Sequence, residues 1–387
     1  MPTLRDGVLI WGSEIDEKAI LQAAKAARLP FMGGHVALMP DAHVGMGATI
    51  GSVIPTMGAI IPSAVGVDLG CGMCAAQTEL NAKDLPDDLS KLFLAIASKV
   101  PAGVGKGHAS PKSGLANALL DFNKLATDLT PKQEQTAVAQ FGTLGSGNHF
   151  VEVCLDENDK VWVVLHSGSR GIGNQLAQRH IEKAKGLMKQ YFVKLEDPDL
   201  AYFVEGTPEF DSYITDVLWA QNYASQSRST MLASVVDELR KFLGLDALET
   251  RTISCHHNFT EREHHHGKDL WITRKGAIRA REGDLGIIPG SMGTSSYIVR
   301  GLGNPASYFS CLHGAGRRMS RSKAKELLSV DTLKARMGIR TWNSDHAEAL
   351  LDEHPDSYKD IDQVMGDQKD LVQIEHTLRQ ILNYKGF

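Results

Sequence analysis

The segment Val65–Cys74 (VGVDLGCGMC) contains three side chains that could do chemistry: Asp68, Cys71 and Cys74. A Cys-x-x-Cys pair is typical of zinc sites and redox centres. A structural zinc site needs a second cysteine pair or a histidine pair at finger spacing, and the sequence contains neither. Apolar residues on both sides disfavour the exposed helix start of a redox site. We therefore interpret Cys74 as a small buried side chain, and Asp68 and Cys71 as candidate metal ligands.

Histidine is frequent in this chain, with 15 residues, and several lie in short segments beside glycine or asparagine. His149 lies in LGSGNHFVE, His166 in LHSGSRGIGN, and the adjacent His256 and His257 in CHHN. Carboxylate, thiolate and imidazole together suit a first-row divalent metal ion. Because a thiolate has enough lone pairs to bridge two ions, these side chains predict a pair of metals. The run His264–His266, by contrast, lies among charged residues (TEREHHHGKD) and is interpreted as a solvated surface turn.

Glycine-rich loops carry most of the remaining polar chemistry. Glycines let the backbone approach a ligand and expose amides to phosphate oxygens. The segment SGSRGIGN directly precedes an expected helix, so its amides could meet a phosphate at the positive helix end. The segment HGAGRRMSR begins with His313 and contains three arginines, Arg317, Arg318 and Arg321. A neutral imidazole can attack phosphorus and arginine grips phosphate through a planar fork; the alternative is a helix start with solvated arginines.

The elements that must position these residues follow from hydrophobic spacing. Amphipathic helices are expected over 13–29, with Ser13 as N-cap, and over about 174–192, 213–243 and 369–383. One face of the second helix should be buried, and its members are Ala177, Ile181, Ala184, Met188 and Tyr191. Short buried strands are expected over 36–82, 161–168 and 251–313. A flexible polar surface loop is expected over 99–115.

Composition limits the class of protein. The chain has 387 residues and a net charge of −5, so no global basic field marks it as a nucleic-acid binder, although a local basic patch is compatible with this charge. Five cysteines are few for this length and indicate a reducing, cytoplasmic compartment. The first residues do not resemble a signal peptide, and no apolar run of about 18 residues predicts a membrane span. Without a sharp composition break, we predict a single α+β domain over residues 1–387, with helices around central β-sheets.

Taken together, these segments resemble the RtcB family of RNA ligases. The resemblance runs from about Trp11 to the C-terminus, and its motifs occur in order: PDAHVGMG, GSVIPT, GVDLGCGM, GTLGSGNHF, LHSGSRGIGN, CHHN, IIPGSMG, VRGLGN, HGAGR and YKG. The family fold implies one α+β domain with a deep active-site cleft. Met46 and the composition of 99–135 depart from the family pattern, which indicates a specialised bacterial member with its own RNA substrate.

The resemblance also implies roles for individual residues. Asp68 and His149 would hold one Mn²⁺, His166 and His257 a second, and Cys71 would bridge the two. His313 would be the nucleophile that takes GMP from GTP. The implied guanylate-binding residues are Asn148, Phe150, Glu152, Asn258, Ser291, Ser296, Ala315, Gly316, Tyr358 and Lys385. The implied RNA phosphate-binding residues are Arg170, Lys275, Arg317 and Arg321.

The activity implied by the resemblance is the joining of RNA 2′,3′-cyclic-phosphate or 3′-phosphate ends to 5′-hydroxyl ends, with GTP and two Mn²⁺. It would serve RNA repair or tRNA splicing in the cytoplasm, without membrane association and with or without a helper protein. Two alternatives keep the same ligands: a metal-dependent cyclic phosphodiesterase or phosphatase that does not ligate, and a non-catalytic RNA-binding paralogue. The presence of both HGAGR and YKG favours the ligase over the first alternative.

Overall fold

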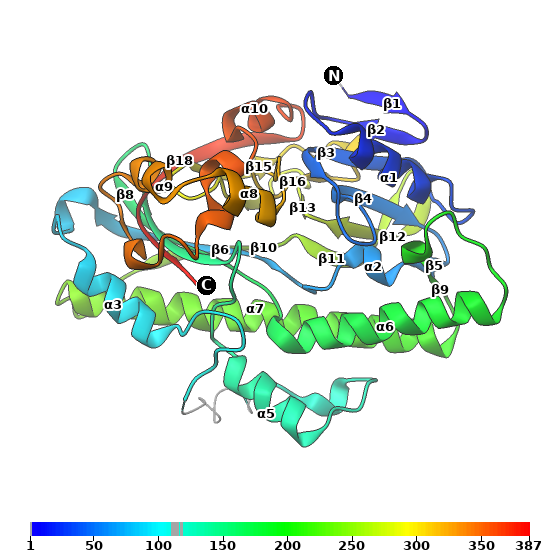
Figure 1. Cartoon of the computed structure of the whole chain (residues 1–387), viewed down its shortest axis with the longest axis horizontal. Helices are drawn as coiled ribbons and strands as arrows, with labels where there is room; N and C mark the ends of the chain where they lie inside the picture. Colours follow the sequence, from blue (N-terminus) through cyan, green and yellow to red (C-terminus); the bar gives the residue numbers. More distant parts are fainter. Residues whose placement is uncertain (1, 110–115, 117–118) are drawn as a thin grey trace.

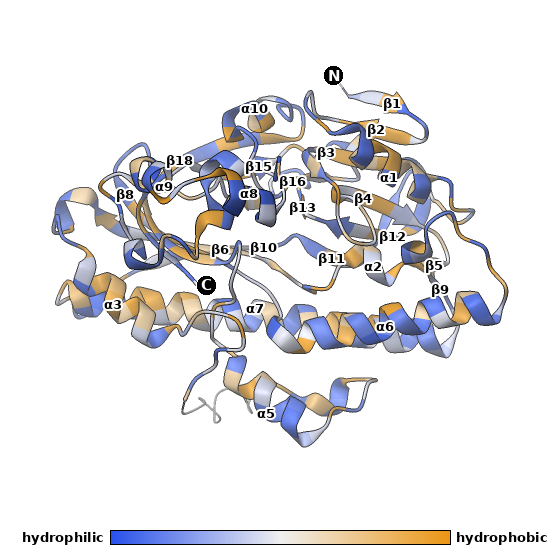
Figure 2. Ribbon diagram, viewed as in Figure 1, coloured by the Kyte–Doolittle hydropathy of each residue, from blue (hydrophilic) through white to orange (hydrophobic). Residues whose placement is uncertain are grey.

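Two β-sheets and a layer of long helices organise the protein (Figure 1). The structure is a computed structural model and describes residues 2–109, 116 and 119–387. Helices α6 (Arg170–Gln190) and α7 (Pro208–Phe242) run beneath the sheets, and α5 (Pro131–Gln140) lies on the outer side of this layer. Figure 2 shows hydrophobic and hydrophilic patches alternating along α6 and α7, as expected of amphipathic helices. The predicted α+β class is confirmed.

The first sheet has six strands, and all neighbours pair antiparallel except the second and third. In spatial order they are β1 (Thr3–Arg5), β2 (Val8–Ile10), β3 (Val36–His43), β4 (Ile50–Thr56), β12 (Lys268–Lys275) and β11 (Asn258–His265). Helix α1 (Glu17–Ala27) covers one face through buried residues such as Ile20 and Ala24, which pack with Val36 and Leu38.

The second sheet has eight strands, and four of the candidate ligands lie in or directly beside them: Cys71, His149, His166 and His257. Its spatial order is β10 (Thr250–His256), β6 (Gly72–Asn81), β8 (Lys160–Ser167), β7 (Phe150–Leu155), β18 (Val372–Lys385), β15 (Ser296–Gly301) and β14 (Leu285–Ile288), with β17 (Thr341–Trp342) beside β18. Helix α3 (Ser90–Lys99) and α7 pack against it, placing Leu92 and Leu239 in one core with Val153 and Val163.

Smaller elements complete the fold. Two short pairs join β13 (Ala277–Arg279) to β16 (Ser310–Leu312) and β5 (Ala59–Ile60) to β9 (Phe203–Val204). The short helices are α2 (Pro62–Val65), α8 (Arg321–Leu327), α9 (Val330–Met337) and α10 (Ile361–Gly366). The strands predicted over 36–82, 161–168 and 251–313 are therefore confirmed.

The helix predicted over 369–383 is wrong, because this segment forms β18. Its backbone pairs with β15 on one side and β7 on the other. The register shifts between Gln380 and Leu382, so a bulge interrupts the inward–outward alternation of side chains. The broken alternation left apolar residues at roughly helical spacing, and that spacing produced the wrong prediction.

Other boundaries differ by a few residues. Helix α1 is capped by Asp16, which accepts from the Lys18 amide at 2.8 Å, whereas Ser13 donates its hydroxyl to Asp367. Helix α6 begins at Arg170 rather than near residue 174. It ends at Gln190, so Tyr191 leaves the buried face and is 65% exposed. The loop predicted over 99–115 is described as far as residue 109, and from Val100 to that point it forms turns without helix or strand; its remainder lies outside the described residues.

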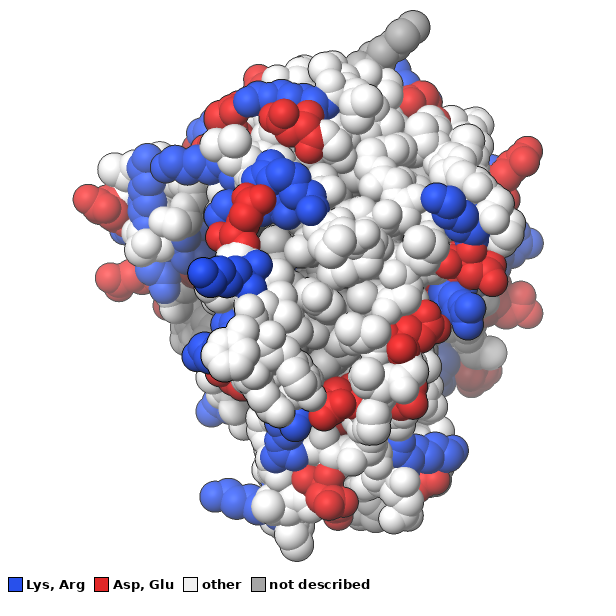
Figure 3. Space-filling view, turned by 90° about the vertical axis from the view of Figure 1, so that its right-hand side faces the viewer, with Lys and Arg blue, Asp and Glu red and all other residues white. Residues whose placement is uncertain are grey.

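The surface agrees with the modest net charge. On the face in Figure 3, Lys and Arg side chains alternate with Asp and Glu around a broad uncharged area. Among the described residues, no helix is long and apolar enough to cross a membrane.

Candidate active site

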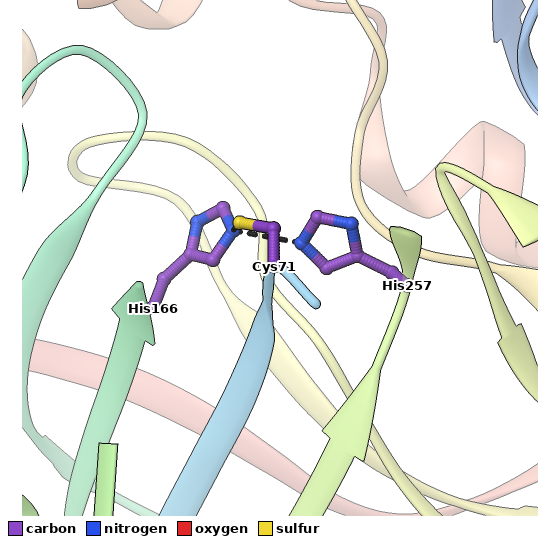
Figure 4. A group of neighbouring side chains, drawn as sticks. All are labelled: Cys71, His166 and His257. Atoms are coloured by element: carbon purple, nitrogen blue, oxygen red, sulfur yellow. Dashed lines mark hydrogen bonds between the residues drawn. The ribbon is translucent and has the colours of Figure 1, made fainter. Parts of the chain in front are cut away.

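The register of the second sheet brings the candidate ligands to one edge. Gly72, the first residue of β6, pairs with His256 of β10 on one side and with Ser167 of β8 on the other. Cys71, His166 and His257 each adjoin one of these paired residues, so the three side chains meet although they are far apart in sequence. Figure 4 shows them converging from the ends of neighbouring strands.

Five side chains form two overlapping groups that share Cys71. The Cys71 Sγ lies 3.3 Å from the Nε2 atoms of both His166 and His149. The His166 and His257 Nε2 atoms are 2.8 Å apart, and His149 Nε2 is 3.1 Å from an Asp68 oxygen. One group is therefore Cys71, His166 and His257, and the other is Asp68, Cys71 and His149. This is the grouping that the family resemblance implied.

Hydrogen bonds fix the tautomers of two of these imidazoles. The Asn148 carbonyl only accepts, so the His166 Nδ1 donates to it at 3.0 Å and Nε2 keeps a lone pair. The Oδ1 atom of Asn258 accepts from the Gly276 amide and faces the His257 Nδ1 at 3.4 Å, which leaves the same arrangement there. Two Nε2 lone pairs that face each other repel unless a cation lies between them. The donor set therefore fits a bound divalent cation.

Electrostatics within the site points the same way. Burial would raise the pKa of Asp68, but the hydrogen bond and charge of His149 outweigh burial and lower this pKa to about 2. Burial and the neighbouring Asp68 charge raise the pKa of the Cys71 thiol well above its ordinary value. Burial lowers the pKa of His166 and His257, which keeps both rings neutral. A divalent cation would supply the positive charge that a Cys71 thiolate requires.

Glycines make this packing possible. A Cβ at Gly168 would lie 2.0 Å from an Asp68 carboxylate oxygen, so only glycine leaves room for that side chain. The same loop enters α6, and the Ser169 amide donates to Asp68 at 3.1 Å. The Gly171 amide donates to Gln140 instead. The sequence predicted that amides at the start of this helix could bind a phosphate, but two of them, those of Ser169 and Gly171, donate to protein side chains.

His313 lies beside this cluster, with its ring centroid 4.8 Å from that of His257. Its Nδ1 is 2.6 Å from Asp41 Oδ2, and its backbone amide also donates to that oxygen at 3.3 Å. A carboxylate that accepts from Nδ1 leaves a lone pair on Nε2 and fixes the ring orientation. Sequence reasoning missed Asp41, although the motif PDAHVG contains it; a carboxylate inside a glycine-bounded motif was the available signal.

Four of the five candidate ligands, together with His313, open onto one cavity of about 600 Å³. Most of the predicted site residues line it: Asp68, Cys71, Asn148, Phe150, Glu152, His166, His257, Asn258, Lys275, Ser291, His313, Ala315, Gly316, Arg317, Arg321, Tyr358 and Lys385. His149, Arg170 and Ser296 are not among the lining residues. The buried Ser296 hydroxyl accepts from the Gly290 amide at 3.3 Å and so supports the loop that leads to Ser291.

Three of the predicted guanylate residues, Phe150, Glu152 and Lys385, lie on the paired strands β7 and β18 and line the cavity. We call this part of the cavity the guanylate arm. Glu152 is almost fully buried and accepts from Asn383 Nδ2 at 2.7 Å. Burial raises the pKa of Glu152 to about 8, even though Lys385 and Asn383 act in the opposite direction. The Lys385 ammonium lies 5.4 Å from the centre of the Phe150 ring, and the two residues pair across β7 and β18.

Glu353, which sequence reasoning also missed, organises the same arm. Its buried carboxylate lies 3.3 Å from the Lys385 ammonium, accepts from the Tyr358 hydroxyl at 2.7 Å, and forms ion pairs with Arg317 and Arg321. Burial alone would raise the pKa of Glu353, but the charges of Lys385 and Arg321 outweigh burial, and the pKa is lowered. In the sequence Glu353 appears only as half of an acidic pair with Asp352, and no local pattern indicates its basic partners.

The remaining predicted phosphate ligands differ in their surroundings. The Arg170 guanidinium donates to Thr143 and to the carbonyls of Gly103 and Lys106, so backbone groups hold it outside the cavity wall. The Lys275 ammonium lines the cavity but donates to the Met46 and Ser63 carbonyls. Burial lowers its pKa to about 8.

Two further interpretations from the sequence are resolved by the structure. Cys74 is buried in the core with Leu92 and Val163, as predicted, and burial raises its pKa to about 12. The run His264–His266 is not a uniformly solvated turn. The side chain of His265 is 1% exposed and lies 3.0 Å from the buried Glu263, because it belongs to the inward face at the end of β11.

Comparisons with known proteins find relatives of this chain over almost its whole length. Residues 22–386 match a family model described as tRNA-splicing ligase RtcB. The chain is 46% identical to the RNA-splicing ligase RtcB of Escherichia coli (strain K12), with 98% of this chain and 97% of the relative covered. It is 31% identical to the tRNA-splicing ligase RtcB of Nanoarchaeum equitans (strain Kin4-M), over 90% of this chain and 87% of the relative. Identity to the RNA-splicing ligase RtcB of Mycobacterium tuberculosis is 28%, over 89% and 95%.

Proposed function

Since the chain belongs to the RtcB family and is an RNA ligase, we propose that its cavity joins RNA 2′,3′-cyclic-phosphate or 3′-phosphate ends to 5′-hydroxyl ends, using GTP and two Mn²⁺. The observation that carries this proposal is the position of His313. Its Nδ1 is bonded to the buried Asp41, and its ring lies 4.8 Å from that of His257 at the wall of the cavity. This leaves the Nε2 lone pair free to act as a nucleophile.

The five side chains Asp68, Cys71, His149, His166 and His257 would hold the two Mn²⁺ ions. When bound, the metals would neutralise phosphate charge and stabilise the oxygens that gain charge as bonds break. The chain contributes the fixed geometry, since Asn148 and Asn258 orient two of the imidazoles. Burial keeps the His166 and His257 rings neutral, which is the form that can coordinate a metal.

His313 would begin the reaction by attacking the α-phosphorus of GTP. A P–N bond forms, the bond to the β-phosphate oxygen breaks, and pyrophosphate leaves with the electron pair. Asp41 holds the Nδ1 proton throughout and stabilises the positive charge that the ring acquires. A cyclic end would first be opened by water to a 3′-phosphate.

The RNA 3′-phosphate then attacks the phosphorus of the His313-bound GMP, the P–N bond breaks, and His313 regains its lone pair. The product is an RNA end activated as RNA(3′)pp(5′)G. In the last step the 5′-hydroxyl attacks the 3′-phosphorus, its proton passes to solvent, and GMP leaves. Glu152 would accept the guanine N1–H and amino hydrogens, with Phe150, Tyr358 and Lys385 around the nucleotide. Such a carboxylate favours GTP over ATP, because adenine lacks those paired donors.

RNA would occupy the rest of the cavity. Arg317 and Arg321 line it, and α6 contributes Gln178 and Lys185 to the lining. These groups suit the phosphate backbone of a strand that must end within reach of the metals. Arg170 would act from behind the wall by holding the loop at Gly103 rather than by direct contact.

Labelling with GTP tests the proposal. With Mn²⁺ and α-labelled GTP, the protein should form an acid-labile, alkali-stable GMP adduct that disappears in His313→Ala. His264→Ala is the matched control, because that side chain is 67% exposed on the β11–β12 hairpin. A labelled His313→Ala protein would refute the nucleophile assignment. Opening of cyclic-phosphate RNA without any adduct would favour the phosphodiesterase alternative.

A further inference from the structure

Arg228 is a fully buried arginine in the middle of α7, directly behind the metal-ligand cluster. One guanidinium nitrogen donates to the Gly70 carbonyl at 2.7 Å and to the Ser167 carbonyl at 2.9 Å. The other terminal nitrogen lies 3.1 Å from the His256 Nδ1. The same Nδ1 lies 3.0 Å from the Gly70 carbonyl, which can only accept, so this ring nitrogen either accepts from Arg228 or donates to Gly70.

The three partners of Arg228 share one property: each is the chain neighbour of a candidate ligand. Gly70 precedes Cys71, Ser167 follows His166, and His256 precedes His257. Arg228 therefore contacts the chain beside all three members of the group Cys71, His166 and His257. In the described part of the chain, Arg228 forms no hydrogen bond with a chain neighbour of His149, which belongs to the other group.

The backbone is shaped to reach this arginine. Gly70 has a φ of +66°, and a Cβ there would lie 2.6 Å from the Cα of Gln221 and 3.2 Å from the Cβ of Ala224, both on α7. Only glycine allows the loop to press against the helix in this conformation. The close approach places the Gly70 carbonyl within reach of Arg228, one turn further along α7.

Packing does not explain the presence of a charge at this position. Among the described residues, Arg228 forms no ion pair with a carboxylate, and its Nε has no hydrogen-bond partner. Burial of an unpaired charge is unfavourable, and an apolar side chain of similar volume is often as good or better for stability. An apolar residue could not supply the two hydrogen bonds to the Gly70 and Ser167 carbonyls or the polar contact with His256.

We propose that Arg228 is a positioning residue that holds Cys71, His166 and His257 at the spacing required for one of the two metal ions. This proposal rests on the proposed metal site. Its new element is that a residue without contact to any ligand atom sets the geometry of one ion position. The planar guanidinium of Arg228 contacts the chain beside each of these three ligands. These contacts keep the two imidazoles and the thiol close together while no ion is bound. Outer-shell partners of this kind typically change metal affinity by about 10- to 100-fold.

The test is metal binding by the full-length protein without GTP or RNA. Mn²⁺ binding to the metal-free protein is measured by calorimetry, and Co²⁺ binding by the thiolate-to-cobalt absorption band, which reports a Cys71 thiolate on the metal. We expect the wild type to bind two ions. Arg228→Met should weaken the binding of one of the two ions by about 10- to 100-fold. Arg228→Lys can still donate to a carbonyl, so its affinity for that ion should lie between those of the wild type and Arg228→Met.

Arg274 provides the matched control. It is also fully buried, and it donates to Ser310, Glu263 and the Tyr308 carbonyl, away from the cluster. Arg274→Lys should keep both ions at wild-type affinity even if its melting temperature falls. Wild-type affinity for both ions in Arg228→Lys and Arg228→Met, or equal losses in Arg228→Lys and Arg274→Lys, would overturn the proposal. A wild-type protein that binds no metal would instead refute the proposed function, so the two failures are distinguishable.

Discussion

Replacement of Asp41 by asparagine isolates the charge behind His313 from its orientation. Asp41 Oδ2 accepts from both the ring Nδ1 and the backbone amide of His313. An asparagine NH₂ group in the place of Oδ2 would face two donors, so the amide oxygen of the asparagine should occupy that place instead. The NH₂ group then occupies the place of Oδ1, which is buried without a hydrogen-bond partner among the described residues. The variant should thus keep the His313 tautomer and lose the negative charge.

The magnitude follows from the type of hydrogen bond that is lost. Bonds to a charged group contribute about 1.5–3 kcal/mol and neutral ones about 0.5–1.5 kcal/mol. The difference, about 1–1.5 kcal/mol, corresponds to about 5- to 13-fold in rate. Asp41→Ala also removes the orientation of the ring and should cost about 10³-fold or more, by analogy with the loss of a triad carboxylate.

The assay is the single-turnover rate of GMP-adduct formation at saturating GTP, with GTP affinity measured separately. Affinity should remain near the wild-type value in both variants, because Asp41 does not line the nucleotide cavity. Asp156→Asn serves as the control: this carboxylate is also buried, accepts from the Trp162 indole at 3.0 Å, and lies away from the cavity. A wild-type rate in Asp41→Asn, or a slower rate in Asp41→Asn than in Asp41→Ala, would refute the reasoning.

Two further predictions concern the metals and the guanylate arm. Cys71→Ala should abolish Mn²⁺ loading measured by elemental analysis, whereas Cys74→Ala should leave it intact because that thiol packs in the core; equal effects would contradict a bridging role for Cys71. Burial raises the pKa of Glu152 to about 8, so below that pH the carboxyl is neutral and must lose a proton before it accepts guanine hydrogens. GTP affinity measured by calorimetry should therefore rise about tenfold per pH unit up to about pH 8 and then level off, and Glu152→Gln should remove this rise; an unchanged profile in the variant would assign the proton to another group.

The candidate metal ligands could be predicted from the sequence because the chemistry of each side chain is visible without the fold. Asp68, Cys71 and three histidines are unusual side chains beside glycines, and the structure brings all five together. The supporting residues carry no such signal. Asp41 acquires its role only through His313, which is 272 positions away, and Arg228 through Gly70, which is 158 positions away. An ordinary aspartate at a strand end and an arginine within a long helix look the same as their many surface counterparts until the fold is known.

The fold shows the same division between local and long-range information. Helices α1, α6 and α7 follow from local periodicity, and errors there concern a cap or a terminus. The state of β18 depends on partners far away in the chain, β7 and β15, and on a bulge at residue 381 that no local pattern announces. This strand matters for function because it carries Asn383 and Lys385 into the cavity.

Glu152 and Glu353 show how the same arm can hold two buried carboxyl groups with opposite tendencies. Glu353 is surrounded by Lys385, Arg317, Arg321 and Tyr358, and its pKa is lowered despite burial. Glu152 has one amide partner and a more distant lysine, and its pKa is raised. Lys385 is thus committed to Glu353, which leaves Glu152 short of positive charge. Under the proposed function, an incoming guanine would supply the missing donors to Glu152, and the site would favour guanine because the protein alone leaves this carboxylate uncompensated.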